Sequence, residues 1–88
     1  MLNYLVEFVG TFVFLSVILR VGEPIPIAVA LLASIYFGGS ISGGHFNPAV
    51  SVMMAMAGKM NMKDLAPYVI AQIAGGLAAL ELYKRVKF

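Results

Sequence analysis

The chain has 88 residues, of which 61% are hydrophobic and 11% are charged, and its net charge is +2. A chain this short cannot bury so much apolar surface in a core of its own, which excludes an ordinary soluble domain and favours a membrane protein. The absence of cysteine excludes a disulfide framework, a thiolate metal site and a cysteine nucleophile. The basic residues lie at the ends of apolar runs and form no stripe, so nucleic-acid binding is not expected.

The apolar runs predict a helix over residues 2–19, a second over 27–40 and another over 65–83. The first run contains one ionisable residue, Glu7, and is long enough to cross about 30 Å of hydrocarbon. No Lys or Arg precedes it, so we expect a membrane anchor rather than a cleaved signal peptide. A polar turn with two prolines separates the first two helices, and a basic cluster follows the last.

Residues 41–58 predict a loop followed by a short helix. Asn47 is a favoured N-cap and Pro48 is preset for the first helical position. A helix from Pro48 to Gly58 would be about 16 Å long, which is half a bilayer. A surface amphipathic helix is the alternative, but the segment has no charged face. We therefore expect an all-α membrane protein in which residues 1–88 form one unit of three transmembrane helices and one re-entrant half-helix.

Three crossings place the two termini on opposite sides of the membrane. The side with the N-terminal amine carries two lysines and the other side carries four basic residues: Lys59 and Lys63 against Arg20, Lys84, Arg85 and Lys87. The positive-inside rule therefore hardly selects an orientation.

The segment 42–51, Ser-Gly-Gly-His-Phe-Asn-Pro-Ala-Val-Ser, closely resembles the half-helix motif in the first repeat of the aquaporin and glycerol-facilitator family. Residues 7–12, Glu-Phe-Val-Gly-Thr-Phe, are similar to that family's first helix, and residues 68–76 are similar to its third. The resemblance covers nearly the whole chain and implies half of the family's inverted-repeat fold. Family members have two such repeats of opposite orientation, whereas this chain has one.

The resemblance implies that Asn47, Pro48 and Ala49 form a helix tip that faces a pore. The Asn47 amide can cap its own helix with its oxygen and still donate from its NH₂ group to a passing water or hydroxyl. The positive end of the half-helix repels cations. The alternative interpretation is a plain helix cap without a pore.

The same resemblance implies that Gly43, Gly44 and His45 present backbone carbonyls to the pore, the alternative being a passive loop. Two further positions depart from the family's narrow constriction. Val50 stands where the family's second repeat has an arginine, and Ile27 matches a position where first repeats often have an aromatic residue. Both departures favour a wider or less selective pore.

Supporting roles are expected for two buried polar side chains. Glu7 should hydrogen-bond the loop backbone or its histidine, with a titrating proton relay as the alternative. Gln72 should tie the third spanning helix to the loop, which differs little from ordinary interhelical hydrogen bonding. The four-residue spacing of Ala71, Gly75 and Ala79 predicts close helix packing.

A single half-helix ends at mid-membrane, whereas inverted repeats place two around one site. We therefore expect a multi-pass integral membrane protein that forms a passive channel for water and/or small uncharged solutes such as glycerol. Its pore would be assembled from two oppositely oriented copies, or from the chain and a complementary half, within a higher oligomer. The alternative is a non-conducting repeat or fragment that associates with or modulates a full-length channel. No enzymatic activity, metal or cofactor is expected, because no nucleophile is paired with a base and no ligand cluster is present.

Overall fold

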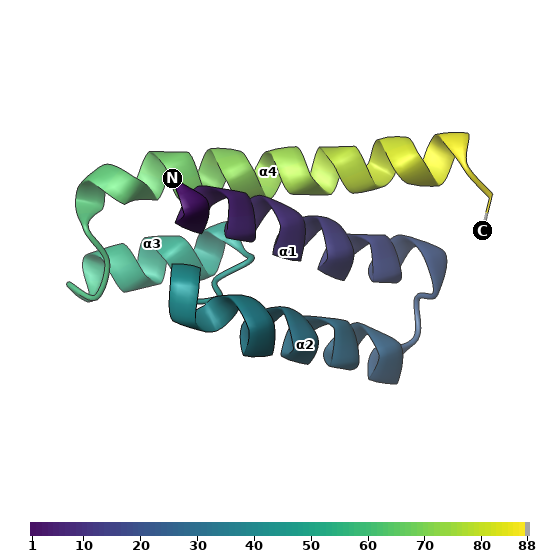
Figure 1. Cartoon of the computed structure of the whole chain (residues 1–88), viewed down its shortest axis with the longest axis horizontal. Coiled ribbons are helices and arrows are strands. Elements are labelled where there is room, and N and C mark those ends of the chain that lie inside the picture. Colours follow the sequence, from purple (N-terminus) through teal and green to yellow (C-terminus); the bar gives the residue numbers. More distant parts are fainter. Residues whose placement is uncertain (88) are drawn as a thin grey trace.

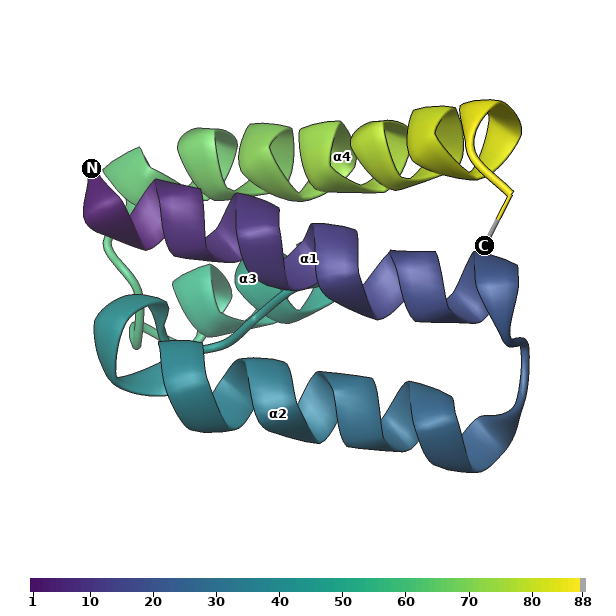
Figure 2. The same ribbon diagram turned by 45° about the vertical axis from the view of Figure 1, so that its right-hand side comes forward.

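The computed structural model describes residues 1–87, which form four helices (Figure 1). In chain order these are α1 (Leu2–Arg20), α2 (Pro24–Ser42), α3 (Pro48–Met56) and α4 (Met62–Arg85). α1 lies between α2 and α4 and packs against both, while the short α3 packs against α4 (Figures 1 and 2). Helices α1, α2 and α4 are long and apolar enough to cross a membrane. The expected all-α class, with three candidate spans and one short helix, is confirmed for the described residues.

α2 is longer at both ends than the expected span of 27–40, because its prolines lie inside the helix rather than before it. Pro24 is the first helical residue, and the first helical hydrogen bond runs from the Ile27 N–H to the Glu23 carbonyl at 3.1 Å. First-turn N–H groups have no partner within a helix, so prolines at these positions remove no hydrogen bond. The helix then continues through Ser42 and ends at Gly43, whose φ is 91°.

α3 ends at Met56, two residues before the expected end at Gly58. Gly58 has a φ of 75° and donates its N–H to the Ala55 carbonyl, while the Lys59 N–H donates to the Met54 carbonyl. This pair of bonds around a left-handed glycine is a Schellman motif, which ends a helix. The nine residues of α3 span about 13 Å.

α4 begins three residues before the expected start at 65 and ends two residues after 83. Asn61 caps its first turn, because its side-chain oxygen accepts a hydrogen bond from the Lys63 N–H at 3.3 Å. Asp64 therefore lies within the first turn, where a carboxylate is favoured by the helix dipole. Its Oδ1 also accepts a hydrogen bond from the Tyr4 hydroxyl at 2.6 Å, which links α4 to α1.

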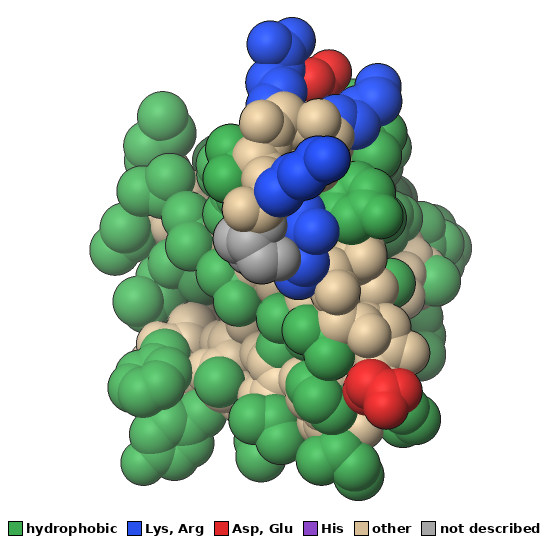
Figure 3. All heavy atoms as spheres, turned by 90° about the vertical axis from the view of Figure 1, so that its right-hand side faces the viewer, with side chains coloured by type: hydrophobic (Ala, Val, Ile, Leu, Met, Phe, Trp, Pro, Cys, Tyr) green, Lys and Arg blue, Asp and Glu red, His purple; other side chains and the backbone are tan. Residues whose placement is uncertain are grey.

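The interior of the bundle is rich in polar side chains, which lie beside small and aromatic ones, and much of its surface is apolar. Within residues 1–87, six buried residues are polar or charged: Glu7, Thr11, Ser42, His45, Ser51 and Gln72. Large hydrophobic side chains point outward along the three long helices and cover much of the face in Figure 3, where basic side chains gather around the end of α4. This arrangement is the reverse of a water-soluble fold. It suits a lipid bilayer, where polar groups must find their hydrogen-bond partners within the protein.

α1 and α4 approach each other closely at Gly75. A Cβ atom built on Gly75 would lie 2.6 Å from the Phe8 carbonyl oxygen, so only glycine permits this separation. Gly75 and Ala79 are buried, whereas Ala71, expected on the same stripe, is only half-buried. At about 100° per residue, Ala71 lies at the edge of a buried face that is centred on Gly75 and Ala79 and extends to Gln72.

Candidate functional site at the half-helix tip

The segment between α2 and α3 turns the chain back into the bundle. Gly43 and Gly44 have φ angles of 91° and 66°, which glycine adopts without a steric cost. Phe46 has a φ of 54°, a conformation that strains a bulky side chain. The segment then enters α3 through Asn47, whose backbone is extended with a φ of −158°.

Glu7 of α1 holds this segment from the inside, and its side chain is fully buried. One carboxylate oxygen, Oε2, accepts hydrogen bonds from the His45 N–H at 3.1 Å and the Ser42 hydroxyl at 2.7 Å. The other, Oε1, accepts from the Phe46 N–H at 2.8 Å and from Gln72 Nε2 at 2.9 Å. Four donors thus compensate a charge that would otherwise be very costly to bury.

The two backbone bonds to Glu7 also orient the loop carbonyls. In a trans peptide the N–H and the C=O point in opposite directions. Because the His45 and Phe46 N–H groups point toward Glu7, the carbonyls of Gly44 and His45 point away from it. No donor within residues 1–87 hydrogen-bonds these two carbonyl oxygens, so both can accept from a solute.

A second group of hydrogen bonds joins the loop to α3 and α4. The Ser51 hydroxyl lies 2.8 Å from His45 Nδ1 and accepts from Gln72 Nε2 at 2.8 Å. The Tyr68 hydroxyl donates to the Ser42 carbonyl at 2.6 Å. Gln72 therefore contacts Glu7 and Ser51 rather than the loop backbone, and Glu7 contacts the backbone of His45 rather than its ring.

The tip itself is exposed. Asn47 Oδ1 accepts from the Ala49 N–H at 2.8 Å, which caps α3. Asn47, Pro48 and Ala49 are all exposed, and the NH₂ group of Asn47 donates to no residue in the described part of the chain. The tip therefore combines a free donor with the positive end of a helix.

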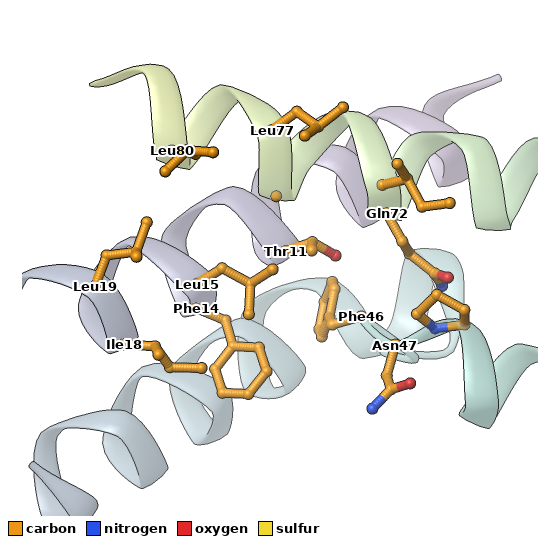
Figure 4. A pocket seen from close by; sticks show the side chains of 13 residues that line it. Thr11, Phe14, Leu15, Ile18, Leu19, Phe46, Asn47, Gln72, Leu77 and Leu80 are labelled. Atoms are coloured by element: carbon orange, nitrogen blue, oxygen red, sulfur yellow. The ribbon is translucent and has the colours of Figure 1, made fainter. Parts of the chain in front are cut away.

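An open groove of about 530 Å³ begins at this tip, and we call it the tip groove (Figure 4). It is lined by Phe46, Asn47 and Pro48, by residues of α1 between 11 and 19 and by residues of α4 between 72 and 80. These are the halves of α1 and α4 that α3 does not reach (Figures 1 and 2). Apart from Thr11, Asn47 and Gln72, its lining side chains are apolar.

Ile27 and Val50, the two expected constriction residues, lie apart in a single chain. Ile27 is in the first turn of α2, next to the α1–α2 turn, whereas Val50 is in the first turn of α3. α3 packs against α4 and not against α2. This single repeat therefore does not bring the two positions into one constriction.

Sequence reasoning assigned no role to Phe46 or Ser51, although both stand inside the half-helix motif. Phe46 is 2% exposed and packs against Gly10 of α1. Ser51 connects His45 to Gln72. A bulky aromatic residue beside a glycine-rich turn was the available signal for Phe46, but its partner Gly10 lies 36 positions away in the chain.

Comparison with known proteins identifies relatives over the whole described chain. Residues 1–87 match the family model described as "Major intrinsic protein". The chain is 42% identical over 88 residues to Glycerol uptake facilitator protein-like 6 of Lactiplantibacillus plantarum, covering 90% of this chain and 41% of that protein. It is 47% identical over 58 residues to Aquaporin Z of Brucella melitensis, covering 66% of this chain and 25% of that protein.

A further relative, Aquaglyceroporin AqpS of Rhizobium meliloti, is 42% identical over 62 residues, covering 70% of this chain and 28% of that protein. The chain thus spans less than half the length of each of these relatives, and no solved structure matches it. The match to the family covers all three helices that can span a membrane. The chain is therefore an integral membrane protein that belongs to the major intrinsic protein family, as the resemblance of its half-helix motif predicted.

Proposed function

We propose that this chain forms half of a passive channel for water or small uncharged solutes such as glycerol, and that two copies in opposite orientations complete the pore. Membership of the family and the names of the relatives, an aquaporin and a glycerol uptake facilitator, support the solute class. The match to less than half of each relative supports the need for a second half.

The tip groove is the observation that carries this proposal. It starts at the α3 tip, beside Gln72 at the middle of α4, and extends to Leu80. That distance is about 12 Å at 1.5 Å per residue, close to the length of α3 itself. A second α3 that enters from the opposite side of the membrane would fit this space and meet the first at its tip.

The chemistry of the tip suits a file of small neutral molecules. The NH₂ group of Asn47 can donate to a water or hydroxyl oxygen, and the carbonyls of Gly44 and His45 can accept from its hydrogens. Two positive helix ends that face each other would repel cations. They would also orient the central water molecule with its oxygen toward the helix ends, which interrupts a proton-conducting chain of waters. The side chains of Val50 and Ile27 carry neither a charge nor an aromatic ring. We therefore expect the constriction to admit solutes larger than water.

Reconstitution into liposomes tests the channel directly. The purified chain should raise water and glycerol permeability above that of empty vesicles in stopped-flow light scattering. Asn47→Ala should lower the permeability per folded protein, because it removes the free donor and the cap. Asn61→Ala is the matched control, since it removes the cap of α4 away from the tip. A folded, oligomeric protein without permeability would contradict the proposal.

The orientation of the copies can be measured separately, because the chain has no native cysteine. Single cysteines at Ala57→Cys and Val86→Cys mark the two ends of the bundle, and both positions are exposed. With opposite orientations, an impermeant thiol reagent should label about half of each variant from outside. Uniform labelling would refute pairing of inverted copies and favour a complementary partner chain, and in that case co-reconstitution with a full-length relative tests the modulating role.

A further inference from the structure

We infer that Phe46 is a positioning residue: its ring fills a niche between α1 and α2 and thereby fixes the depth of the α3 tip. The consequence for transport rests on the proposed channel function, whereas the position of the tip can be measured without it. The inference rests on how the ring packs, on the backbone conformation at Phe46 and on the two grooves that the ring separates.

The niche is formed by two glycines. A Cβ atom built on Gly10 would lie 2.1 Å from Phe46 Cε1, and one built on Gly38 would lie 3.5 Å from Phe46 Cζ. The ring therefore lies directly against the α1 backbone, and it is 2% exposed. No other residue type at position 10 leaves room for the ring in this place.

The backbone at Phe46 adopts a conformation that its own side chain opposes. Its φ of 54° lies in the left-handed region, which is strained for a bulky residue. Such strain persists only where the surroundings hold the residue in place. Here the ring is held by the glycine niche and the N–H by Glu7 at 2.8 Å. Asn47 follows directly, so the anchored ring determines where the exposed amide stands.

The Phe46 ring also lies between two grooves on the surface of the bundle. It lines the tip groove and a second groove of about 400 Å³ between α1 and α2, which we call the outer groove. Loss of the ring would join the two grooves and allow the tip to sink toward α2. The Asn47 amide would then leave the line along which solutes pass.

A distance measurement tests the position of the tip. Spin labels at Ala49→Cys and Lys84→Cys, in a minority of labelled chains, report the separation of the tip from the end of α4. We expect a narrow distribution in the parent protein and a shifted or broadened one in Phe46→Ala. Phe37→Ala is the matched control, because Phe37 lines the outer groove but is 77% exposed. An unchanged distribution in Phe46→Ala would refute the inference.

Transport then tests the consequence by a double-mutant cycle. Gly10→Ala and Phe46→Ala should each lower water permeability per folded protein by about tenfold, the effect of raising a barrier by 1.36 kcal/mol. Gly10→Ala should add little in the Phe46→Ala background, because the clash is gone, and Phe46→Leu should retain most of the permeability. The inference would be overturned if the two losses of water permeability were additive in the double variant. It would also be overturned if permeability fell only in proportion to the amount of folded protein. A parent protein that does not conduct refutes the channel, while the spin-label distances still decide the role of Phe46.

Discussion

The tip groove and the outer groove lie on opposite sides of Phe46, and both are open, apolar and of similar volume, about 530 and 400 Å³. Their polar atoms differ. In the outer groove, the Ser34 hydroxyl donates to the Ala30 carbonyl of its own helix at 2.9 Å. The tip groove contains the free amide of Asn47. Beside it, the buried Thr11 Oγ1 and Gln72 Oε1 have no hydrogen-bond partner within the described residues.

Because the two grooves share size and hydrophobicity, these properties do not by themselves favour the tip groove as the proposed pore wall. The outer groove has no free side-chain donor, because the Ser34 hydroxyl is bonded to its own helix. The tip groove brings a donor and a helix end beside Thr11 and Gln72, near the middle of the spanning helices α1 and α4. Single substitutions can either remove this contrast or make it measurable.

The largest effect is expected from Glu7→Gln. The new amide replaces one carboxylate oxygen by an NH₂ group, which faces two of the four hydrogen-bond donors, and it removes the charge that all four compensate. Loss of such a buried centre should lower the free energy of unfolding in detergent by about 3–5 kcal/mol and abolish conduction. Glu81→Gln is the control, because that exposed carboxylate only pairs with Arg85. If both variants unfold alike, Glu7 does not hold the tip.

The next effect is expected from Gly75→Ala, which widens the base of the tip groove. The added Cβ would meet the Phe8 carbonyl oxygen at 2.6 Å, so α1 and α4 must separate at a cost of about 1–3 kcal/mol. Gly76→Ala is a close control, since its Cβ would meet only the flexible end of Leu15 at 3.0 Å. Thermal unfolding in detergent compares the two. Equal stability of the two variants would mean that the close approach at Gly75 is not required.

Val50→Arg should increase the selectivity for water over glycerol without a large change in the free energy of unfolding. Each α3 would then carry a cation in its first turn, which should narrow an assembled pore and lower the ratio of glycerol to water permeability by about tenfold. Both permeabilities are measured on the same vesicles. An unchanged ratio would show that Val50 does not face the pore, and the pairing geometry proposed for the tip groove would be wrong.

The smallest effect is expected from Ser34→Ala in the outer groove. Its hydroxyl bonds only its own helix, so stability should change by less than about 0.5 kcal/mol and permeability should stay the same. A clear change in water permeability would show that solutes pass along the outer groove. The contrast between the two grooves would then fail.

The sequence predicted the elements well because their signals are local. Caps, prolines and apolar runs lie within a few residues of the ends that they determine, so the number and type of the helices agree with the structure. Both ends of α2 and α4 and the C-terminal end of α3 differ by two or three residues, whereas α1 differs by one residue at its end. At α2, the two prolines that the sequence pattern assigns to the preceding turn stand in the first turn of the helix. At α3, Gly58, which the sequence pattern predicts as the last helical residue, forms the Schellman motif that ends the helix.

The sequence also indicated the residues of the tip, but not the way in which they are held. Glu7 and Gln72 were recognised as polar groups that need partners, yet their actual bonds to Phe46 and Ser51 connect residues 39 and 21 positions apart. Which donors meet a carboxylate depends on how three helices pack. That packing in turn depends on the close approach permitted by Gly75, which hydropathy does not report.

By itself, then, the sequence determined that this chain enters a membrane and that Asn47 begins a half-helix, because hydrophobic transfer and helix capping are local properties. Only the tertiary structure decided that the loop carbonyls turn away from Glu7, that Phe46 separates two grooves and that the tip is left exposed on one side. These features arise from contacts between residues far apart in the chain, whose energies depend on backbone approach and on the pairing of buried polar groups.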